Sequence, residues 1–273
     1  MGDRSQSDAD WAELSRNGFV ILRAQYTAEA ILDFQTVAAA AAARINRTVA
    51  TTTPRQTLYK IFGNLVDYWE TDGYTISEAA PGRHDGEIMP EDEQAVSPRG
   101  FASNPPPQLA ALMRRALKRD YTWYGGLLTS TTRSSTGVWH RDVVSLFGDF
   151  RIDGSLPPYF FTVLVPTVPI SVENGPTEIV LGSHRTQDDI LERLKLTTDS
   201  EHDLGVTSEL ALCDVGDIII MDGRCIHRGR ANQSCGGRDV LYMVWNKIWY
   251  SAPWKQDELP LNSWQHAPGE ELG

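Results

Sequence analysis

The apolar pattern of the first 120 residues predicts helices separated by loops. A short helix is expected at residues 7–14 and a short apolar strand at residues 19–22. The clearest helix covers residues 27–47, where apolar side chains recur at helical spacing and Thr27 can cap the first turn. A further helix is expected at residues 108–119, directly after three consecutive prolines. This half of the chain is therefore expected to be mainly helical.

Residues 71–103 interrupt this pattern because they are acidic and rich in Gly and Pro. A loop of this length inside a compact domain is either a lid over a site or a disordered segment. We expect a lid that partly closes a pocket.

The second half of the chain has a different pattern, in which short β-branched or aromatic runs recur between turn signals. Such closely spaced strands favour an antiparallel sandwich or barrel with the helices packed outside it. The expected strands are residues 127–132, 160–165, 177–181, 208–213, 217–221 and 240–250.

No internal repeat or linker divides the chain, so one domain is expected over residues 1–273. In this interpretation residues 1–120 form a mainly helical flank and lid. Residues 121–252 form the β-rich core, and residues 253–273 form a C-terminal tail.

Composition excludes several classes of partner. A net charge of -11 argues against nucleic acid and against an anionic membrane surface, because both require clustered Lys and Arg. The three cysteines show no CxxC spacing, which favours a reducing compartment. The N-terminus has no apolar run, and no run is long enough to span a membrane, so a cytoplasmic location is expected. The aromatic residues of the tail could cover the site or a partner subunit, and a homodimer is a further expectation.

The segment Trp139-His140-Arg141-Asp142 is the first candidate for chemistry. Residues two apart on a strand point the same way, so His140 and Asp142 can bind one metal ion. His227 is the best third ligand, because it follows a Gly-Asp turn and a buried apolar strand at residues 216–222. Two imidazoles and one carboxylate on one face form the triad of non-haem Fe(II) oxygenases. The sequence therefore predicts an iron site that activates dioxygen.

Arg238 extends the prediction to a co-substrate. It lies eleven residues after His227 and opens the next strand. An antiparallel return would bring its guanidinium back to the site, where it could pair with the distal carboxylate of a 2-oxo acid bound to the iron. The alternative is a surface charge at the end of a strand.

With these motifs the chain resembles the phytanoyl-CoA dioxygenase family of Fe(II)- and 2-oxoglutarate-dependent oxygenases. Residues 173–185, Glu-Asn-Gly-Pro-Thr-Glu-Ile-Val-Leu-Gly-Ser-His-Arg, are similar to that family's Asn-Gly-Pro…Pro-Gly-Ser-His-Arg stretch. The resemblance covers about residues 127–250, and the N-terminal half shares only its helical character. Two positions depart from the family pattern. Leu181 replaces a proline, and Val138 stands where several relatives carry a Gln near the co-substrate.

The resemblance implies a fold and a set of roles. The fold would be mostly β with flanking helices around a double-stranded β-helix, a cupin-like jelly roll. His140, Asp142 and His227 match the iron ligands, and Arg238 matches the residue that pairs with 2-oxoglutarate. Thr177 matches a position whose hydroxyl contacts that co-substrate. The implied reaction couples decarboxylation of 2-oxoglutarate by O2 to oxidation of a C–H bond, as hydroxylation, desaturation or cyclisation. The ligand Asp142 argues against halogenation, because related halogenases carry a small residue there.

Other candidate residues have structural alternatives. Tyr59 and Lys60 could line the pocket mouth, or belong to a packed element with the lysine reaching solvent. Trp139 could form a wall of the substrate pocket or part of the core. His184 is expected to stabilise a loop, and Arg141 to form an ion pair at the surface or behind the metal site. The remaining histidines, His84, His202 and His266, are expected to be solvated.

The function predicted from these residues is oxidation of a small molecule, in the setting of natural-product biosynthesis. One alternative is an Fe(II) oxidase that uses the same triad without 2-oxoglutarate. Another is a non-catalytic jelly-roll protein that binds a small molecule. Arg238 separates the first two hypotheses, because only a 2-oxo acid with a distal carboxylate requires it.

Overall fold

The computed structural model describes residues 4–59, 64–71, 73–89, 92, 105–148, 150–186, 188–196 and 205–250. Within them, antiparallel strands build a nine-stranded sheet in the order β1-β10-β7-β12-β6-β5-β4-β3-β2 and a three-stranded sheet in the order β11-β8-β9. This arrangement confirms the predicted fold class, a mostly β jelly roll with flanking helices.

Seven strands of the larger and smaller sheets come from the part of the chain that was expected to be β. Six of them overlap the predicted positions, whereas the strand at residues 227–229 was not expected. All are held in antiparallel register. Their bounds are β6 Tyr121–Ser130, β7 Phe160–Pro166, β8 Thr177–Val180, β9 Ser208–Leu210, β10 Ile218–Asp222, β11 His227–Gly229 and β12 Arg238–Lys247.

Strand β6 begins six residues before the expected position, because Gly125 and Gly126 lie inside the strand instead of ending it. The ring of Tyr242, directly opposite Gly126 on β12, occupies the space that a Cβ at Gly126 would fill. The glycine therefore serves a close side-chain approach across the sheet.

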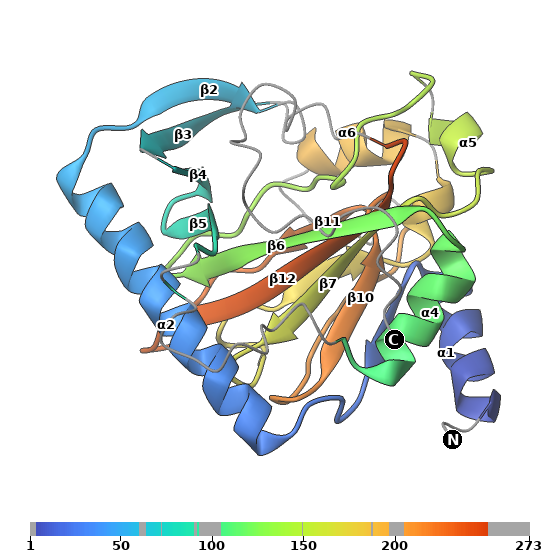
Figure 1. Cartoon of the computed structure of the whole chain (residues 1–273). Helices are drawn as coiled ribbons and strands as arrows, with labels where there is room; N and C mark the ends of the chain where they lie inside the picture. The colour runs from blue at the N-terminus through green and yellow to red at the C-terminus, as the bar shows by residue number, and fades with distance from the viewer. Residues whose placement is uncertain are drawn as a thin grey trace.

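The helices cover the outer face of the large sheet. They are α1 Arg4–Asn17, α2 Ala28–Thr51 and α4 Pro107–Leu117, with β1 Phe19–Leu22 joining the sheet between the first two. Thr27 caps α2 as expected, since its side chain accepts a hydrogen bond from the N–H of Ala30. In Figure 1, α2 runs along the large sheet, while α1 and α4 lie together near the β10 side. Apolar faces of α2 and α4 pack on the sheet in the main hydrophobic core.

The prediction of a mainly helical first 120 residues is wrong between residues 55 and 87. This segment forms β2 Arg55–Tyr59, β3 Asn64–Thr71, β4 Tyr74–Ala80 and β5 Arg83–Glu87, which extend the large sheet beyond β6. The irregular lid expected from residue 71 is therefore two strands as far as residue 87. The part of it at residues 93–103 lies outside the described residues.

The reason for this error is that one face of β3, β4 and β5 packs in the core whereas the other meets a cavity. Trp69 of β3 and Ile76 of β4 are paired and pack in the core beneath α2. On the other face, Tyr68, Ser77 and Asp85 line a cavity. Polar residues that face a cavity break the apolar alternation by which a half-buried strand is recognised.

Smaller helical pieces complete the described chain. They are α5 Phe150–Asp153, the single 3-10 turn η1 Ser183–Arg185 and α6 Asp188–Leu196. In the described part of the chain, no helix combines the length and apolar character needed to span a membrane.

Candidate metal and co-substrate site

A cavity of about 250 Å³ lies between the two sheets of the jelly roll. Its lining includes His140, Asp142 and His227, together with Arg238 and Thr177. The structure therefore brings together all five residues that the sequence indicated for the metal and the co-substrate.

The three candidate metal ligands converge from two chain segments. His140 and His227 form an antiparallel bridge through backbone hydrogen bonds of 3.0 and 2.9 Å. Oδ1 of Asp142 lies 3.7 Å from Nε2 of His140 and 3.5 Å from Nε2 of His227. One donor atom from each residue lies within 4.8 Å of the others. This spacing fits three ligands on one face of a single transition-metal ion.

The backbone fixes which nitrogen each histidine presents to a metal. Nδ1 of His140 lies 2.9 Å from the carbonyl oxygen of Val138, and Nδ1 of His227 lies 3.1 Å from that of Cys225. A carbonyl can only accept, so Nδ1 carries the proton and Nε2 keeps its lone pair for the metal. Burial, together with the nearby His227, holds the pKa of His140 well below its usual value. The imidazole of His140 is therefore in the neutral form that metal binding requires.

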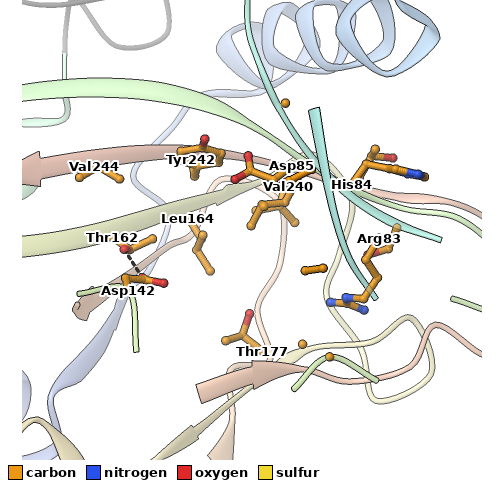
Figure 2. Close-up of a pocket in the computed structure, with 18 of the residues that line it drawn as sticks. Arg83, His84, Asp85, Asp142, Thr162, Leu164, Thr177, Val240, Tyr242 and Val244 are labelled. Carbon is orange, nitrogen blue, oxygen red and sulfur yellow. Dashed lines mark hydrogen bonds between the residues drawn. The ribbon is translucent and has the colours of Figure 1, made fainter. Parts of the chain in front are cut away.

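Thr162 of β7 holds the second carboxylate oxygen of Asp142 by a hydrogen bond. Its hydroxyl donates a 2.5 Å hydrogen bond to Oδ2 of Asp142, the dashed line in Figure 2. The other oxygen, Oδ1, is the one that faces the two imidazoles. Sequence patterning missed Thr162, because nothing in an apolar strand marks one threonine as a partner of a distant aspartate.

Arg238 is buried at the start of β12, with 4% of its surface exposed. Its guanidinium donates a 3.1 Å hydrogen bond to Oγ of Ser130, and its Nε has no hydrogen-bond partner in the described part of the chain. Burial, with the charge of Arg83 nearby, lowers the pKa of Arg238 to about 9. Within the described residues no carboxylate lies within 4.0 Å of it. The surface alternative for Arg238 is therefore wrong, and its position suits an anionic ligand in the cavity.

Arg83 is a second cation of the cavity that sequence reasoning missed. Arg83 lies on β5 directly opposite Ser130 of β6. Arg238 of β12 lies opposite the same serine on its other side. Its Nη1 donates a 2.6 Å hydrogen bond to the carbonyl of Arg230, and burial lowers its pKa to about 10. The guanidinium lies against Gly229, where a Cβ would collide with it. The missed signal was the alternation of Arg83, Asp85 and Glu87 on one strand face.

Thr177 opens β8 and pairs with Gly229 of β11, so it lies on the small sheet at the edge of the cavity. Figure 2 shows Thr177 across the cavity from Val240, with Arg83 pointing toward the same region. This placement is compatible with a contact between its hydroxyl and a ligand that also reaches the two arginines.

Of the candidate substrate residues, Trp139 does not line the cavity. Trp139 is 4% exposed and packs in a core cluster with Val180 and Ile226. The guanidinium of Arg228 stacks over its ring at 4.1 Å. Trp139 is therefore a core residue, because neighbouring strand residues point to opposite faces and its neighbour His140 occupies the cavity side. Tyr59 ends the edge strand β2, and Lys60 lies outside the described residues.

Of the two places expected for Arg141, the structure shows the one behind the candidate metal site. Arg141 is 2% exposed, and its guanidinium donates to the carbonyls of Ser183, Thr186 and Arg224. It thereby ties the metal-binding loop to the 3-10 turn behind it. The expectation that His84 is solvated is wrong, because His84 is 6% exposed and lies 3.5 Å from Glu78, directly opposite it on β4.

For the other histidines, His184 contacts the carbonyl of Ser15 at 3.3 Å, in keeping with a structural role. His202 and His266 lie outside the described residues.

Comparisons with known proteins identify the family of the chain. The model of the family described as phytanoyl-CoA dioxygenase matches residues 14–240. A curated relative from Aspergillus calidoustus, the iron/α-ketoglutarate-dependent dioxygenase ausU, is 30% identical over 128 residues, which cover 45% of this chain and 39% of the relative. The match therefore spans about two-fifths of the length of that relative.

Solved structures share the fold at low sequence identity. The epimerase SnoN in complex with Fe3+, α-ketoglutarate and nogalamycin RO has a TM-score of 0.57 at 17% identity, over 98% of this chain and 95% of SnoN. HygX from Streptomyces hygroscopicus, with nickel, 2-oxoglutarate and hygromycin B bound, has a TM-score of 0.55 at 17% identity, over 89% and 88% of the two chains. The predictions of family, fold class and cofactor class are thereby confirmed.

Proposed function

Because this chain belongs to the phytanoyl-CoA dioxygenase family, we propose that it is an Fe(II)- and 2-oxoglutarate-dependent oxygenase acting on a C–H bond of a small molecule. The observation that carries the proposal is the placement of Arg238. A buried guanidinium without a carboxylate partner among the described residues shares one cavity with a His-Asp-His triad. A metal site alone needs no such cation.

The donor set suits Fe(II). Two neutral imidazoles and one carboxylate leave open positions for further ligands, unlike the closed four-ligand sets of structural zinc. When bound, the iron would supply activation of dioxygen. Thr162 would keep Asp142 a ligand through one oxygen, so that fewer coordination positions are taken by the protein.

The arginines and Thr177 provide the binding site for 2-oxoglutarate. Arg238 would pair with the distal carboxylate, since a guanidinium presents two parallel N–H donors that match a carboxylate. Arg83 approaches the same end of the cavity from β5, and Thr177 offers a hydroxyl from the small sheet. Apolar side chains of Leu164 and Val240 line the cavity between this end and the metal.

The rest of the cavity is available to the substrate. Its lining from β3, β4 and β5 is polar, whereas that from β7 and β12 is largely apolar. SnoN and HygX are solved with nogalamycin RO and hygromycin B, which supports a natural product as the class of substrate. Hydroxylation, desaturation and cyclisation are all open to this site. A homodimer and a cytoplasmic location remain predictions from the sequence alone.

Anaerobic addition of Fe(II) and then 2-oxoglutarate to the apoprotein tests the proposal. A weak visible charge-transfer band is expected, because chelation of iron by the 2-oxo acid creates it, and His140→Ala should abolish it. In air, the intact protein should release succinate from 2-oxoglutarate. If the intact protein gave neither the band nor succinate, the use of 2-oxoglutarate would be excluded. An Fe(II) oxidase of the alternative kind would consume O2 without either signal.

A further inference from the structure

Arg141 lies between two candidate metal ligands in the sequence, yet its side chain does not line the cavity that they share. His140 and Asp142 face that cavity, whereas Arg141 is 2% exposed and binds behind the loop. Its Nη1 donates to the carbonyl oxygen of Ser183, at 2.7 Å, and to that of Arg224. A guanidinium presents five N–H donors in a rigid fork, so it can bind several carbonyls in one defined arrangement. Arg141 therefore joins the loop of the first two ligands to two other segments of the chain.

Both of these segments lead to His227, the third candidate ligand. Arg224 precedes His227 by three residues in the loop between β10 and β11. Ser183 holds the same loop from η1, because its Oγ accepts a 2.8 Å hydrogen bond from the N–H of Ile226. The contacts of one buried guanidinium thus connect the loop of the first two ligands with the residues directly before the third.

Arg224 extends the connection to α5. It is 2% exposed and forms a two-point ion pair with Asp222, in which Nε and Nη2 lie 2.9 and 2.7 Å from the two carboxylate oxygens. Its Nη1 donates a 2.7 Å hydrogen bond to the carbonyl oxygen of Asp153. The carboxylate of Asp153 in turn accepts a 2.9 Å hydrogen bond from the N–H of Leu146. Two buried arginines therefore hold the loop at residues 141–146 at its start and at its end.

This bracing matters because the donor atoms of the three candidate ligands repel one another. Oδ1 of Asp142 lies 3.7 Å from Nε2 of His140 and 3.5 Å from Nε2 of His227. With the protons on Nδ1, both Nε2 atoms carry lone pairs, so three acceptors face one another. Before a metal binds, this repulsion works against the spacing that a metal needs. The spacing is therefore imposed from outside the cavity, by the backbone bridge between the two histidines and by the side chain of Arg141 behind it.

Building on the proposed function, we propose that Arg141 is a positioning residue for the metal site. It holds Asp142 and His227 at the separation that a single ion requires, so that metal binding does not also have to order two loops. Ser183 relays this effect, because its carbonyl accepts from Arg141 and its hydroxyl accepts from the N–H of Ile226.

Co(II) binding to the apoprotein tests the proposal without turnover. The visible d–d bands of Co(II) report the number and arrangement of its ligands, and their titration gives a dissociation constant. Arg141→Lys keeps the charge and loses the fork, so the dissociation constant should rise by about tenfold or more. The bands of the bound Co(II) should also change in shape or intensity. A residue that served only stability would lower the free energy of unfolding and leave both readouts of the folded protein unchanged.

Ser183→Ala is a milder change in the same connection. It keeps the carbonyl that Arg141 binds and removes the hydroxyl that holds Ile226. The Co(II) dissociation constant should rise severalfold, and this effect should not add to that of Arg141→Lys, because both changes break one connection. If Arg141→Lys does not fold, Ser183→Ala decides the question by itself.

Arg44→Lys is the matched control. The side chain of Arg44 is 12% exposed and donates to the carbonyl oxygen of Glu87, but it pairs with Asp92 and does not line the cavity. Arg44→Lys should lower the free energy of unfolding and leave Co(II) binding unchanged. Unchanged Co(II) affinity and bands in Arg141→Lys and Ser183→Ala, or an equal loss of affinity in Arg44→Lys, would overturn the proposal.

The same titration separates this proposal from the proposed function. The unchanged protein should give Co(II) bands that His140→Ala abolishes. If His140→Ala bound Co(II) as the unchanged protein does, the metal site of the proposed function would fail. If His140→Ala lost the bands while Arg141→Lys and Ser183→Ala matched the unchanged protein, only the positioning role of Arg141 would fail.

Discussion

The hydroxyl of Thr162 donates a hydrogen bond to Oδ2 of Asp142, leaving Oδ1 to face the two imidazoles. Thr162 belongs to β7, which lies between β10 and β12 in the large sheet, whereas Asp142 lies in a loop after the bridge at His140. A rigid strand therefore sets the orientation of a ligand that lies on a loop. Partners of this kind tune the affinity of a metal site although they do not touch the metal.

Replacing Thr162 should weaken metal binding without removing a ligand. Thr162→Val keeps the shape of the side chain and removes the donor, so Asp142 would lose its fixed orientation. We expect the dissociation constant for Fe(II) to rise by about tenfold or more. Thr162→Ser retains the hydroxyl and should stay close to the unchanged protein. An equal loss in both variants, measured by anaerobic titration, would assign the effect to packing instead.

Replacing Arg238 should affect the co-substrate and leave the metal bound. Arg238→Gln removes the charge that pairs with the distal carboxylate, and the 2-oxoglutarate dissociation constant should rise by roughly a hundredfold. Titration of the charge-transfer band measures this constant. Arg55→Gln, which removes an arginine that is 54% exposed on β2, is the control. Unchanged affinity in Arg238→Gln would contradict the assigned role.

Gly229 offers an indirect way to displace Arg83. A Cβ at this position would lie 2.5 Å from Cζ of Arg83, so Gly229→Ala should push the guanidinium away. We expect the affinity for 2-oxoglutarate to fall about tenfold, as in Arg83→Gln. The two changes should not add in the double variant, because both remove one contact.

Gly137→Ala is the matched control for this prediction. Gly137 donates a backbone hydrogen bond to Gly229, but its Cβ would meet nothing closer than 3.7 Å. If Gly137→Ala weakened binding as much as Gly229→Ala, displacement of Arg83 would not explain the result.

Asp217 predicts an acid-dependent loss of stability. Burial works to raise its pKa, but hydrogen bonds from the N–H of Ala24, from Arg23 and from the N–H of Asp214 outweigh burial and lower it. The ionised carboxylate therefore stabilises the fold above the unfolded pKa of about 3.9, and this contribution is lost as pH falls through the lower folded value.

Asp217→Asn should accordingly reduce the free energy of unfolding by about 1 kcal/mol at neutral pH and by much less near pH 3. Urea unfolding at a series of pH values measures both. Asp214→Asn, in the same turn, is the control because its backbone N–H, not its carboxylate, makes the bond to Asp217. A cost for Asp217→Asn that did not change with pH would contradict the electrostatic explanation.

Patterning predicted the elements that bury a continuous apolar face. The helix expected at residues 27–47 and found at 28–51, its Thr27 cap, and the strand expected at 217–221 and found at 218–222 follow from spacing and turn residues, since these are local properties. Strands β3–β5 were not predicted, because one of their faces meets a cavity. Polar side chains such as Ser77 and Asp85 stand where an apolar residue is expected.

For the site, the sequence by itself predicted the candidate metal ligands His140, Asp142 and His227 and the cation Arg238, because short motifs and spacing carry those residue types. Only the tertiary structure decided that Arg83 joins Arg238, that Thr162 holds Asp142, and that Trp139 is core. Each of these depends on which strand lies beside which and in what register. A one-residue shift would turn each side chain to the other face, and register is fixed by packing of the whole sheet.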